Sequence, residues 1–277
     1  MFINSPPRIT RCLLMCCALA LLLCQVVSAQ PLVRIGGSRS GTGGMRLLAQ
    51  AFMRAHPTFA VEVESSFGSA GGIRALIAGR VDLVVTDRAP TSAELAKRPM
   101  RSVEYARTPV AIAVHKKLGL AALTSSQLAG LFGPGADRYP NGMRARAVLR
   151  PFDDADTEEL KAFSPEVSSA VDAALRRPGM LYADTDGDAA DLVEHTPGAF
   201  ACIALALIES EGRPLTALAI DGVTPTVAHL VDGSYPHFKT LYMIVRADAG
   251  TNTNLFVAFV QSDEARAILR ANGHLPR

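Results

Sequence analysis

Residues 65–87 read SSFGSAGGIRALIAGRVDLVVTD and combine a glycine-rich loop, a helical segment and a short strand. Serine and glycine predominate in residues 65–72, as expected of a loop, and the residues that follow to position 78 predict a helix. Residues 81–85 are a short apolar run of the kind found in buried strands, and it ends at Thr86 and Asp87. The stretch therefore predicts a loop, a helix and a buried strand in succession.

The same alternation of strands and helices continues on both sides of this stretch. We predict strands at residues 32–35, 59–64, 110–114, 145–149 and 241–245, and helices at residues 45–55, 125–131 and 254–270. Residues 198–207 fit a strand, or a strand followed by a helix. This alternation favours an α/β fold with a parallel sheet. No sequence repeat or proline-rich linker divides the chain, so a second lobe would have to be discontinuous in sequence.

Two glycine-containing loops, residues 36–44 and 65–72, stand directly before predicted helices. The first amides of a helix have no partner within the helix and carry a partial positive charge, so such loops suit an anion. Two converging helix starts would form a better oxyanion pocket than one. Serine-capped turns without a ligand are the alternative for each loop taken alone. The first loop lacks the endings of a P-loop and of a dinucleotide-binding loop, so nucleotide binding is not supported.

The N-terminal residues have the features of a secretory signal. Arg8 and Arg11 precede an uncharged stretch, residues 12–27, and the triplet VSA at residues 27–29 fits a cleavage site. We predict that residues 1–29 are removed and that the mature protein is periplasmic. A membrane anchor is the alternative, but the apolar run is shorter than the roughly 20 residues that span a bilayer. A lipoprotein cut before Cys24 would need a small residue where leucine stands.

Charge and residue content exclude several classes of protein. Without the two arginines of the predicted signal, 26 basic residues stand against 26 acidic ones, so nucleic acid has no electrostatic footprint. Four of the five cysteines lie in the predicted signal, which leaves Cys202 as a small buried residue and permits no internal disulfide. The histidines are scattered singly, so we predict no metal site and no cofactor. No spacing of His, Asp and Ser suggests a triad, and we predict no enzymatic activity.

Residues 184–188, DTDGD, match a calcium-binding loop only in part. The glycine stands at the fourth loop position rather than the sixth, and His195 takes the place of the closing glutamate. Acidic capping of a helix that begins near Ala189 is the simpler interpretation.

Taken together, the motifs resemble those of the phosphate-binding periplasmic proteins that serve ABC uptake systems. The strongest match is GSAGGI at residues 68–73, which is followed by VDLVVTDR at residues 81–88. TPGAF at residues 196–200 is similar to the family's turn before a strand of its second lobe. IDGVTPT at residues 220–226 and GSYP at residues 233–236 are similar to its late hairpin and return crossing. The matches are spread over most of the mature chain.

The resemblance implies an α/β fold of the type II periplasmic binding protein, with two lobes joined by crossing strands and a ligand cleft between them. It assigns residues 30–108 and 246–277 to lobe I and residues 109–245 to lobe II. It also places residues 108–114 and 241–245 near the hinge, whose closure would be the functional motion.

The ligand that the resemblance implies is a small oxyanion, with phosphate as the first candidate. The residues carried over as ligand contacts are Ser38, Ser40, Gly41, Ser69, Asp87, Arg150 and Thr157. Ser69 would donate its hydroxyl and amide, and Arg150 would be the charged clamp from the other lobe. Asp87 would accept from a protonated ligand oxygen and would repel an oxyanion without such a hydrogen. Ser38, Ser40 and Thr42 are alternatives for the contact from the first loop.

The sequence after Arg150 departs from the family. The family follows its arginine with Ser-Gly-Thr at a helix start, whereas here residues 151–157 read PFDDADT and only Thr157 matches. The carboxylates in this segment would repel an anion unless they face solvent or a partner. We interpret Asp156 as the cap of a helix at residues 157–163.

We therefore predict an exported, monomeric solute-binding protein that captures a small oxyanion for an ABC permease and performs no chemistry. One alternative is a sensor or accessory protein of the same fold, in which the cleft or residues 153–156 contact a protein partner. A second alternative is an exported phosphate-ester hydrolase with Ser69 or Asp87 as nucleophile. That enzyme would need a base or a metal, and the sequence suggests neither.

Overall fold

The computed structural model describes residues 30–134 and 138–277. The predicted signal, residues 1–29, lies outside these residues. Residues Leu32–Arg277 form one compact unit. None of the described helices combines the length and the apolar character that crossing a membrane requires.

Strands and helices alternate through much of this unit. The strands are β1 (Leu32–Gly37), β2 (Ala60–Val63), β3 (Leu83–Thr86), β4 (Met100–His115), β5 (Ala122–Leu123), β6 (Arg146–Leu149), β7 (Leu181–Tyr182), β8 (Ala199–Ala204), β9 (Leu215–Ala217), β10 (Ala219–Ile220), β11 (Phe238–Arg246) and β12 (Leu275–Pro276). The helices are α2 (Arg39–Ala55), α3 (Gly68–Ile77), α4 (Ser92–Lys97), α5 (Ser125–Gly130), α6 (Ala155–Lys161), α7 (Pro165–Leu175), α8 (Asp186–His195), α9 (Leu205–Ser210), α10 (Val227–Val231), α11 (Thr251–Val260), α12 (Asp263–Arg270) and the short 3-10 helix η1 (Lys116–Leu118).

The main sheet is mixed and has the order β2-β1-β3-β11-β4-β8-β6-β7. β1 pairs in parallel with β2 and β3, and β6 pairs in parallel with β7 and β8. β11 is antiparallel to β3 and β4, and β4 is antiparallel to β8. The prediction of a parallel sheet is therefore wrong at the centre. The cause is that β4 leads the chain from one parallel half to the other and β11 leads it back.

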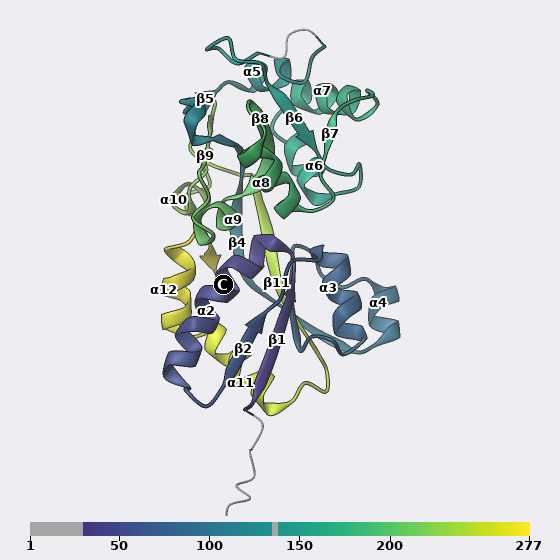
Figure 1. Cartoon of the computed structure of the whole chain (residues 1–277), viewed down its shortest axis with the longest axis vertical. Coiled ribbons are helices and arrows are strands. Elements are labelled where there is room, and N and C mark those ends of the chain that lie inside the picture. Colours follow the sequence, from purple (N-terminus) through teal and green to yellow (C-terminus); the bar gives the residue numbers. More distant parts are fainter. Residues whose placement is uncertain (1–29, 135–137) are drawn as a thin grey trace, which may run out of the picture. The chain divides into compact units, whose positions relative to one another are not determined.

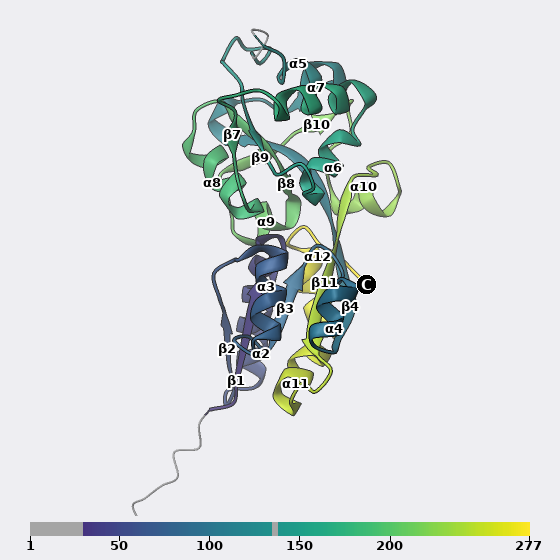
Figure 2. The ribbon, with the colours of Figure 1, turned by 90° about the vertical axis from the view of Figure 1, so that its right-hand side faces the viewer.

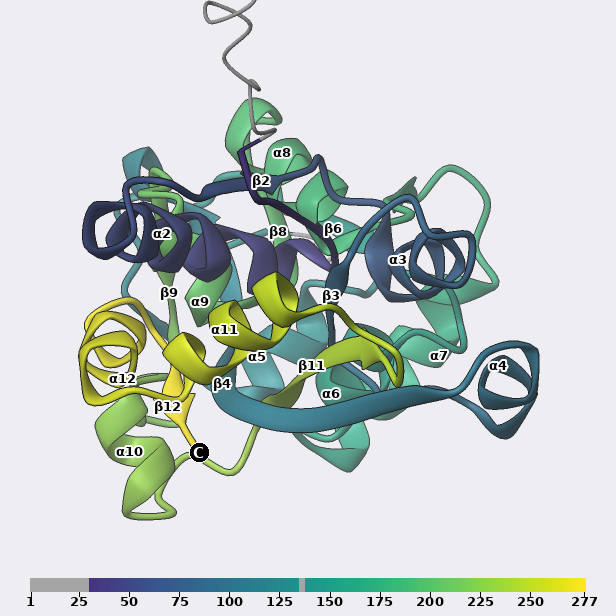
Figure 3. The ribbon, with the colours of Figure 1, turned by 90° about the horizontal axis from the view of Figure 1, so that it is seen from below.

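The core of lobe I, which we define by β1, β2, β3 and the adjoining parts of β4 and β11, lies on both faces of the sheet. Leu83 and Val85 pack with side chains of α2, α11 and α12, whereas Val84 between them packs with side chains of α3. Alternation of this kind follows from the two-residue period of a strand. Figures 1 and 3 show α2, α11 and α12 on one side of these strands and α3 on the other.

The core of lobe II, which we define by β6, β7, β8 and the far part of β4, is built in the same way. Phe200 and Cys202 of β8 pack with side chains of α5, α6 and α7, and Ala201 and Ile203 pack with side chains of α8 and α9. Figure 2 shows these two groups of helices on opposite sides of β8. Cys202 is buried as expected, and burial raises its pKa well above the usual value.

The chain passes between the lobes on β4 and β11. β4 pairs with β11 up to Pro109 and with β8 from Val110 onwards. Lys239 of β11 stands opposite Thr108 of β4 at this crossing. Leu241, two residues further along β11, packs in the core of lobe I. The limits of the two lobes in sequence stay a prediction.

Helix α2 begins at Arg39, although the glycines of residues 36–44 predict a loop. Gly43 and Gly44 lie inside the helix because other parts of the chain pass very close to them. A Cβ atom at Gly43 would stand 2.1 Å from a side-chain oxygen of α9, and one at Gly44 would stand 2.8 Å from the ring of His274. These glycines serve close packing, which a local sequence pattern does not distinguish from a loop.

Two further helix limits differ from the prediction. α3 begins at Gly68 rather than near residue 73, and Gly72 allows it to approach β1, since a Cβ there would stand 2.8 Å from the Cα of Gly37. The segment predicted as one terminal helix forms both α11 and α12. Ser262 separates them because its hydroxyl caps α12.

The caps of α6 and α8 also differ from the prediction. Asp154, not Asp156, caps α6 by accepting a hydrogen bond from the Asp156 amide at 2.9 Å. Thr185 caps α8, which begins at Asp186 rather than near Ala189. The side chains of Asp156 and Asp186 are therefore free to point into the protein, and both are buried.

Candidate ligand-binding site

The start of α2 carries three of the predicted contacts. The amide of Ser38 donates to the carbonyl of Val85 on β3 at 2.8 Å, which holds this end of the helix against the sheet. Ser38 is 1% exposed and Ser40 is 0% exposed. The amide of Gly41 donates to the Ser38 carbonyl at 3.1 Å and is therefore used within the turn. Thr42 is buried, and its hydroxyl has no hydrogen-bond partner among the described residues.

A carboxylate from lobe II occupies the donors at this helix start. Oδ2 of Asp186 accepts from the Ser40 amide at 2.6 Å and from the Ser38 hydroxyl at 3.0 Å. The hydroxyl of Ser40 donates to the same oxygen. Asp186 is the first residue of α8 and is 3% exposed. It therefore joins the two lobes through buried hydrogen bonds.

Ser69 and Asp87 form a second pair, within lobe I. The hydroxyl of Ser69 donates to Oδ1 of Asp87, and the amide of Asp87 donates to Oγ of Ser69 at 3.1 Å. Ser69 lies in the first turn of α3, whose close approach to Gly37 brings it next to the start of α2. The two glycine-rich segments thus meet at one end of the sheet.

Arg150 and Thr157 lie in lobe II after β6. Arg150 is 8% exposed, and its guanidinium donates to Asp154 at 2.6 Å and to the carbonyl of Ala183 at 2.9 Å. Its Nε lies 3.6 Å from Oδ2 of Asp156. The hydroxyl of Thr157 donates at 2.9 Å to the carbonyl of the residue that follows Arg150. Two of the three carboxylates that follow Arg150, those of Asp154 and Asp156, therefore pair with it, whereas Asp153 is exposed.

Lys239 and Asp156 form a buried ion pair at the crossing of β11. Lys239 Nζ lies 2.5 Å from Asp156 Oδ1 and 3.8 Å from Asp87 Oδ2. The side chains of Lys239 and Asp156 are 2% and 0% exposed. Among the described residues, neither Lys239 Nζ nor the Asp156 oxygens have a well-aligned hydrogen bond. Lys239 thus links a carboxylate of lobe I with one of lobe II.

These ionisable residues form one group between the lobes, which we name the charged cluster. Its members are Asp87, Asp154, Asp156, Asp186, Arg150 and Lys239. Four carboxylates and two cations give a net charge of −2 when all are ionised. An anion that enters this site must therefore overcome repulsion as well as find hydrogen-bond donors.

Burial and neighbouring charges change the acidity of the cluster. Burial raises the pKa of Asp156 to about 6, although the attraction of Lys239 opposes the increase. Burial alone would lower the pKa of Lys239, but the surrounding carboxylates raise it above its usual value. Burial acts to raise the pKa of Asp186, yet attraction to Lys239 and the hydrogen bonds from Ser40 outweigh burial and lower it. Lys239 and Asp186 are therefore both held in their charged forms.

The structure brings three of the seven predicted contacts into one network. Ser69 and Asp87 connect through Lys239 and Asp156 to Arg150. In a separate set of bonds, Ser38 and Ser40 contact Asp186, while the hydrogen bonds of Gly41 and Thr157 described above are local. Whether these residues bind a ligand stays a prediction.

Sequence reasoning missed Lys239 and gave Asp186 a different role. A lysine in the strand FKTLYMIVR, where most residues are apolar, is a usable signal for a buried charge. For Asp186 no local signal exists, because its partners lie on α2 and are distant in sequence.

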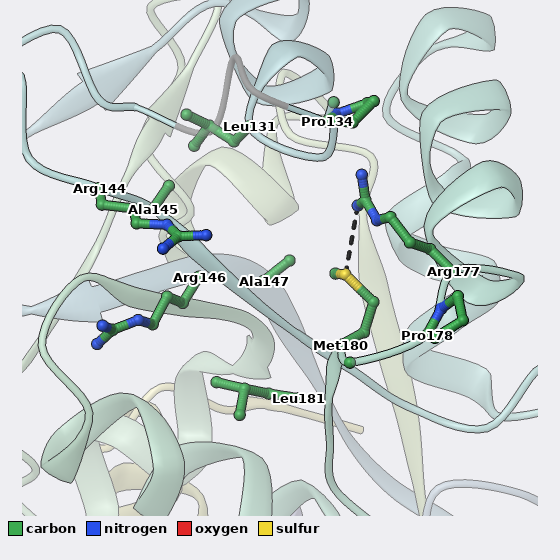
Figure 4. A pocket seen from close by; sticks show the side chains of 12 residues that line it. Leu131, Pro134, Arg144, Ala145, Arg146, Ala147, Arg177, Pro178, Met180 and Leu181 are labelled. Atoms are coloured by element: carbon green, nitrogen blue, oxygen red, sulfur yellow. Dashed lines mark hydrogen bonds between the residues drawn. The ribbon is translucent and has the colours of Figure 1, made fainter.

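A separate pocket of about 360 Å³ lies in lobe II and is lined by none of the charged cluster. Figure 4 shows Arg144, Arg146 and Arg177 around it, with Arg177 directed at the sulfur of Met180. Arg177 donates to that sulfur at 3.3 Å, and Arg146 donates to a backbone carbonyl at 2.9 Å. Arginines attract anions. A variant in this pocket is therefore a suitable control in experiments that locate a bound anion.

The three carboxylates of the DTDGD segment lie in different environments. Asp188 accepts from the Thr185 amide at 3.1 Å and its hydroxyl at 2.7 Å as part of a capping box, Asp186 faces α2, and Asp184 is exposed. Within residues 30–134 and 138–277, no group of three His, Cys, Asp or Glu side chains is arranged to hold a metal ion.

Two α/β lobes linked by crossing strands define the fold of a type II periplasmic binding protein. A family model described as PBP superfamily domain matches residues 25–264. The chain belongs to this family, which confirms the resemblance found in its sequence motifs.

Individual relatives are similar over nearly the whole chain. Phosphate-binding protein PstS of Bacillus subtilis (strain 168) is 23% identical over 247 residues, which cover 86% of this chain and 79% of that protein. A structure from Clostridium perfringens, described as a phosphate ABC transporter substrate-binding protein with bound phosphate, matches with a TM-score of 0.69 at 19% identity and covers 89% of this chain and 99% of that one. An ABC-type phosphate transport receptor from Vibrio cholerae matches with a TM-score of 0.54 at 21% identity, covering 88% and 99%. At these identities the two structures establish the shared fold.

Proposed function

We propose that the mature chain is a solute-binding protein that captures inorganic phosphate and delivers it to an ABC permease. The names of its relatives support this ligand, and one of the similar structures contains phosphate. The observation on this chain that carries the proposal is the pairing of Ser69 with Asp87 at the start of α3. The proposal assigns the chain no reaction, because those relatives are named as binding proteins.

The Ser69–Asp87 pair suits phosphate for a definite chemical reason. A carboxylate can accept a hydrogen bond from a protonated phosphate oxygen, whereas sulfate at neutral pH has no such hydrogen and would be repelled. The first amides of α3 supply donors for the other oxygens, and the Ser69 hydroxyl can join them only when it turns away from Asp87. Arg150 contributes a planar cation from lobe II that can make paired hydrogen bonds to a phosphate.

The test is calorimetric titration of the exported protein with phosphate and with sulfate at pH 7. We expect saturable binding of phosphate and none of sulfate. Arg150→Lys keeps the charge but loses the planar fork, so the affinity for phosphate should fall about tenfold or more. Arg146→Gln, in the pocket of Figure 4, is the matched control and should bind as the wild type does.

Three results would contradict the proposal. Loss of phosphate binding in Arg146→Gln, with binding kept in Arg150→Lys, would move the anion to the pocket in lobe II. Equal binding of sulfate and phosphate would mean that Asp87 does not discriminate between the two anions. The absence of heat with both anions would exclude phosphate as the ligand.

We also infer that the protein reaches the periplasm through a cleaved signal. The inference rests on the sequence of residues 1–29. Mass spectrometry of the exported protein should give Gln30 as its first residue. A lipid-modified N-terminus at Cys24 would instead identify a lipoprotein, and an uncleaved N-terminus would identify a membrane anchor.

A further inference from the structure

The start of α2 already holds an anion, the carboxylate of Asp186. A single oxygen, Oδ2, accepts from the Ser40 amide at 2.6 Å, from the Ser38 hydroxyl at 3.0 Å and from the Ser40 hydroxyl. These are the donors that an external oxyanion would need at this end of the site. A phosphate oxygen and Asp186 Oδ2 cannot share them, because both are negatively charged and require the same hydrogens.

Capping of α8 does not explain the position of this side chain. Thr185 and Asp188 already form a capping box for α8. Only the other oxygen of Asp186, Oδ1, contacts its own helix, by accepting from the Gly187 amide at 3.0 Å. Oδ2 reaches instead from lobe II to lobe I. The absence of a side chain at Gly187 favours this approach, since a Cβ there would stand 2.4 Å from the side chain of Arg39 on α2.

The charged cluster lies in the same site and adds a second influence on Asp186. Lys239 Nζ is buried and has no well-aligned hydrogen bond among the described residues, and the same is true of both Asp156 oxygens. Lys239 Nζ and Asp156 Oδ1 are nevertheless 2.5 Å apart, so each is the nearest charged partner of the other. Burial acts to raise the pKa of Asp186, but attraction to Lys239 and the hydrogen bonds from Ser40 lower it, which favours the charged form that competes for the α2 donors.

We propose that Asp186 is a tethered competitor that occupies the α2 end of the ligand site and that phosphate must displace. This proposal rests on the proposed function and concerns the regulation of the same site. A group held on the protein acts at a high effective concentration, so it competes without being bound tightly. The apparent affinity for phosphate is then reduced to the fraction of molecules in which Asp186 has left the α2 donors. Displacement also breaks a contact between the lobes, so ligand entry and lobe movement are coupled.

The test is phosphate titration of Asp186→Asn, which removes the charge while keeping the shape of the side chain. If the competitor occupies the site in about nine of ten molecules, its removal should raise the phosphate affinity about tenfold. Asp184→Asn removes a charge from the same segment at an exposed position and should leave the affinity unchanged. Asp156→Asn removes a buried charge that does not touch α2 and should give a clearly smaller gain than Asp186→Asn.

A second measurement does not depend on phosphate. Hydrogen exchange of the Ser40 amide should be slow in the wild type, because that amide donates to Asp186, and should become faster in Asp186→Ala. Addition of phosphate to Asp186→Ala should slow it again. In Asp186→Asn the new amide oxygen can still accept a hydrogen bond from Ser40. Asp186→Ala has no such oxygen and therefore removes the contact completely.

The outcomes separate this proposal from the proposed function. Equal phosphate affinity of the wild type and Asp186→Asn would overturn the proposal that Asp186 competes with phosphate and would leave the proposed function intact. An equal gain in Asp156→Asn and Asp186→Asn would also overturn it, because net charge alone would then explain the result. Failure of every protein to bind phosphate would overturn the proposed function, while faster exchange of the Ser40 amide in Asp186→Ala would still support the contact between α8 and α2.

Discussion

Replacement of Lys239 by methionine is expected to lower the free energy of unfolding by about 3 to 5 kcal/mol. Lys239 Nζ lies 2.5 Å from Asp156 Oδ1 and 3.8 Å from Asp87 Oδ2. Its removal leaves Asp156, which is 0% exposed, as a buried carboxylate without its nearest cation. Methionine has a similar unbranched side chain, so lost packing contributes little to the change. The expected loss is therefore almost entirely electrostatic.

Urea unfolding followed by circular dichroism measures this loss, and two further variants establish its cause. Arg98→Met breaks an ion pair with Asp248 whose side chains are 40% and 68% exposed, and such pairs contribute less than about 1 kcal/mol. The double variant Lys239→Met/Asp156→Asn should recover part of the loss, because it removes the stranded charge. A change below about 1 kcal/mol in Lys239→Met, or no recovery in the double variant, would contradict the ion-pair explanation.

Most of the buried strands could be located from sequence because each has its own run of apolar residues, whereas the more exposed first part of β4 and the short strands β5, β7, β9, β10 and β12 were not predicted. The run at residues 81–85 becomes β3, and its alternation places Val84 on one face and Leu83 with Val85 on the other. The starts of α2 and α3 could not be predicted in this way. Gly43 and Gly44 stand in a helix because α9 and His274 approach them, and such contacts belong to the tertiary structure.

The residues of the site show the same difference. Some are positioned by neighbouring parts of the sequence and others by distant parts. Ser69 and Asp87 could be chosen from sequence through the family resemblance, and the structure pairs them within the one short segment of residues 65–87. The pairing of Asp156 with Lys239 was not predictable, because Asp156 follows β6 and Lys239 lies on β11. An aspartate near a helix start favours a capping role by its local pattern alone. Only the fold shows that its side chain turns towards a buried lysine.

The pH dependence of stability should report the titration of Asp156. Its pKa is raised from 3.8 to about 6, with burial as the largest cause. Below pH 3.8 the carboxyl is protonated in the folded and unfolded chains, and its contribution to stability is fully present. Between pH 3.8 and about 6 the unfolded chain ionises more readily, so the folded protein loses stability as the pH rises. At about 1.36 kcal/mol per pH unit, the complete loss is about 3 kcal/mol.

Several charged groups face Asp156, and their titration must be separated from its own. Lys239 stays protonated throughout this window, since the carboxylates raise its pKa. Asp186 has a lowered pKa, so its contribution is present above its usual pKa of 3.8 and is lost only at lower pH. Arg150, Asp154, Asp87 and Glu159 are retained in the comparison variant, and the pKa of Glu159 is raised mainly by its burial, with a further contribution from Asp156. A difference between the wild type and Asp156→Asn above pH 4.5 therefore reports the titration of Asp156 together with its effect on Glu159.

The measurement is urea unfolding of the wild type and Asp156→Asn at intervals from about pH 4.5 to about pH 7.5, a range that contains about two thirds of the expected loss. The stability of the wild type relative to the variant should fall by about 2 kcal/mol as the pH rises through this range. Parallel curves would mean that Asp156 ionises at its ordinary pKa in the folded protein, and a relative increase with pH would mean that Lys239 and Arg150 stabilise the ionised form more strongly than burial opposes it. The expected fall requires the opposite balance, in which the carboxylates of the charged cluster and the loss of water outweigh two neighbouring cations. The same balance makes the neutral form of Asp156 the better neighbour for an entering anion, because protonation reduces the net charge of the cluster from −2 to −1.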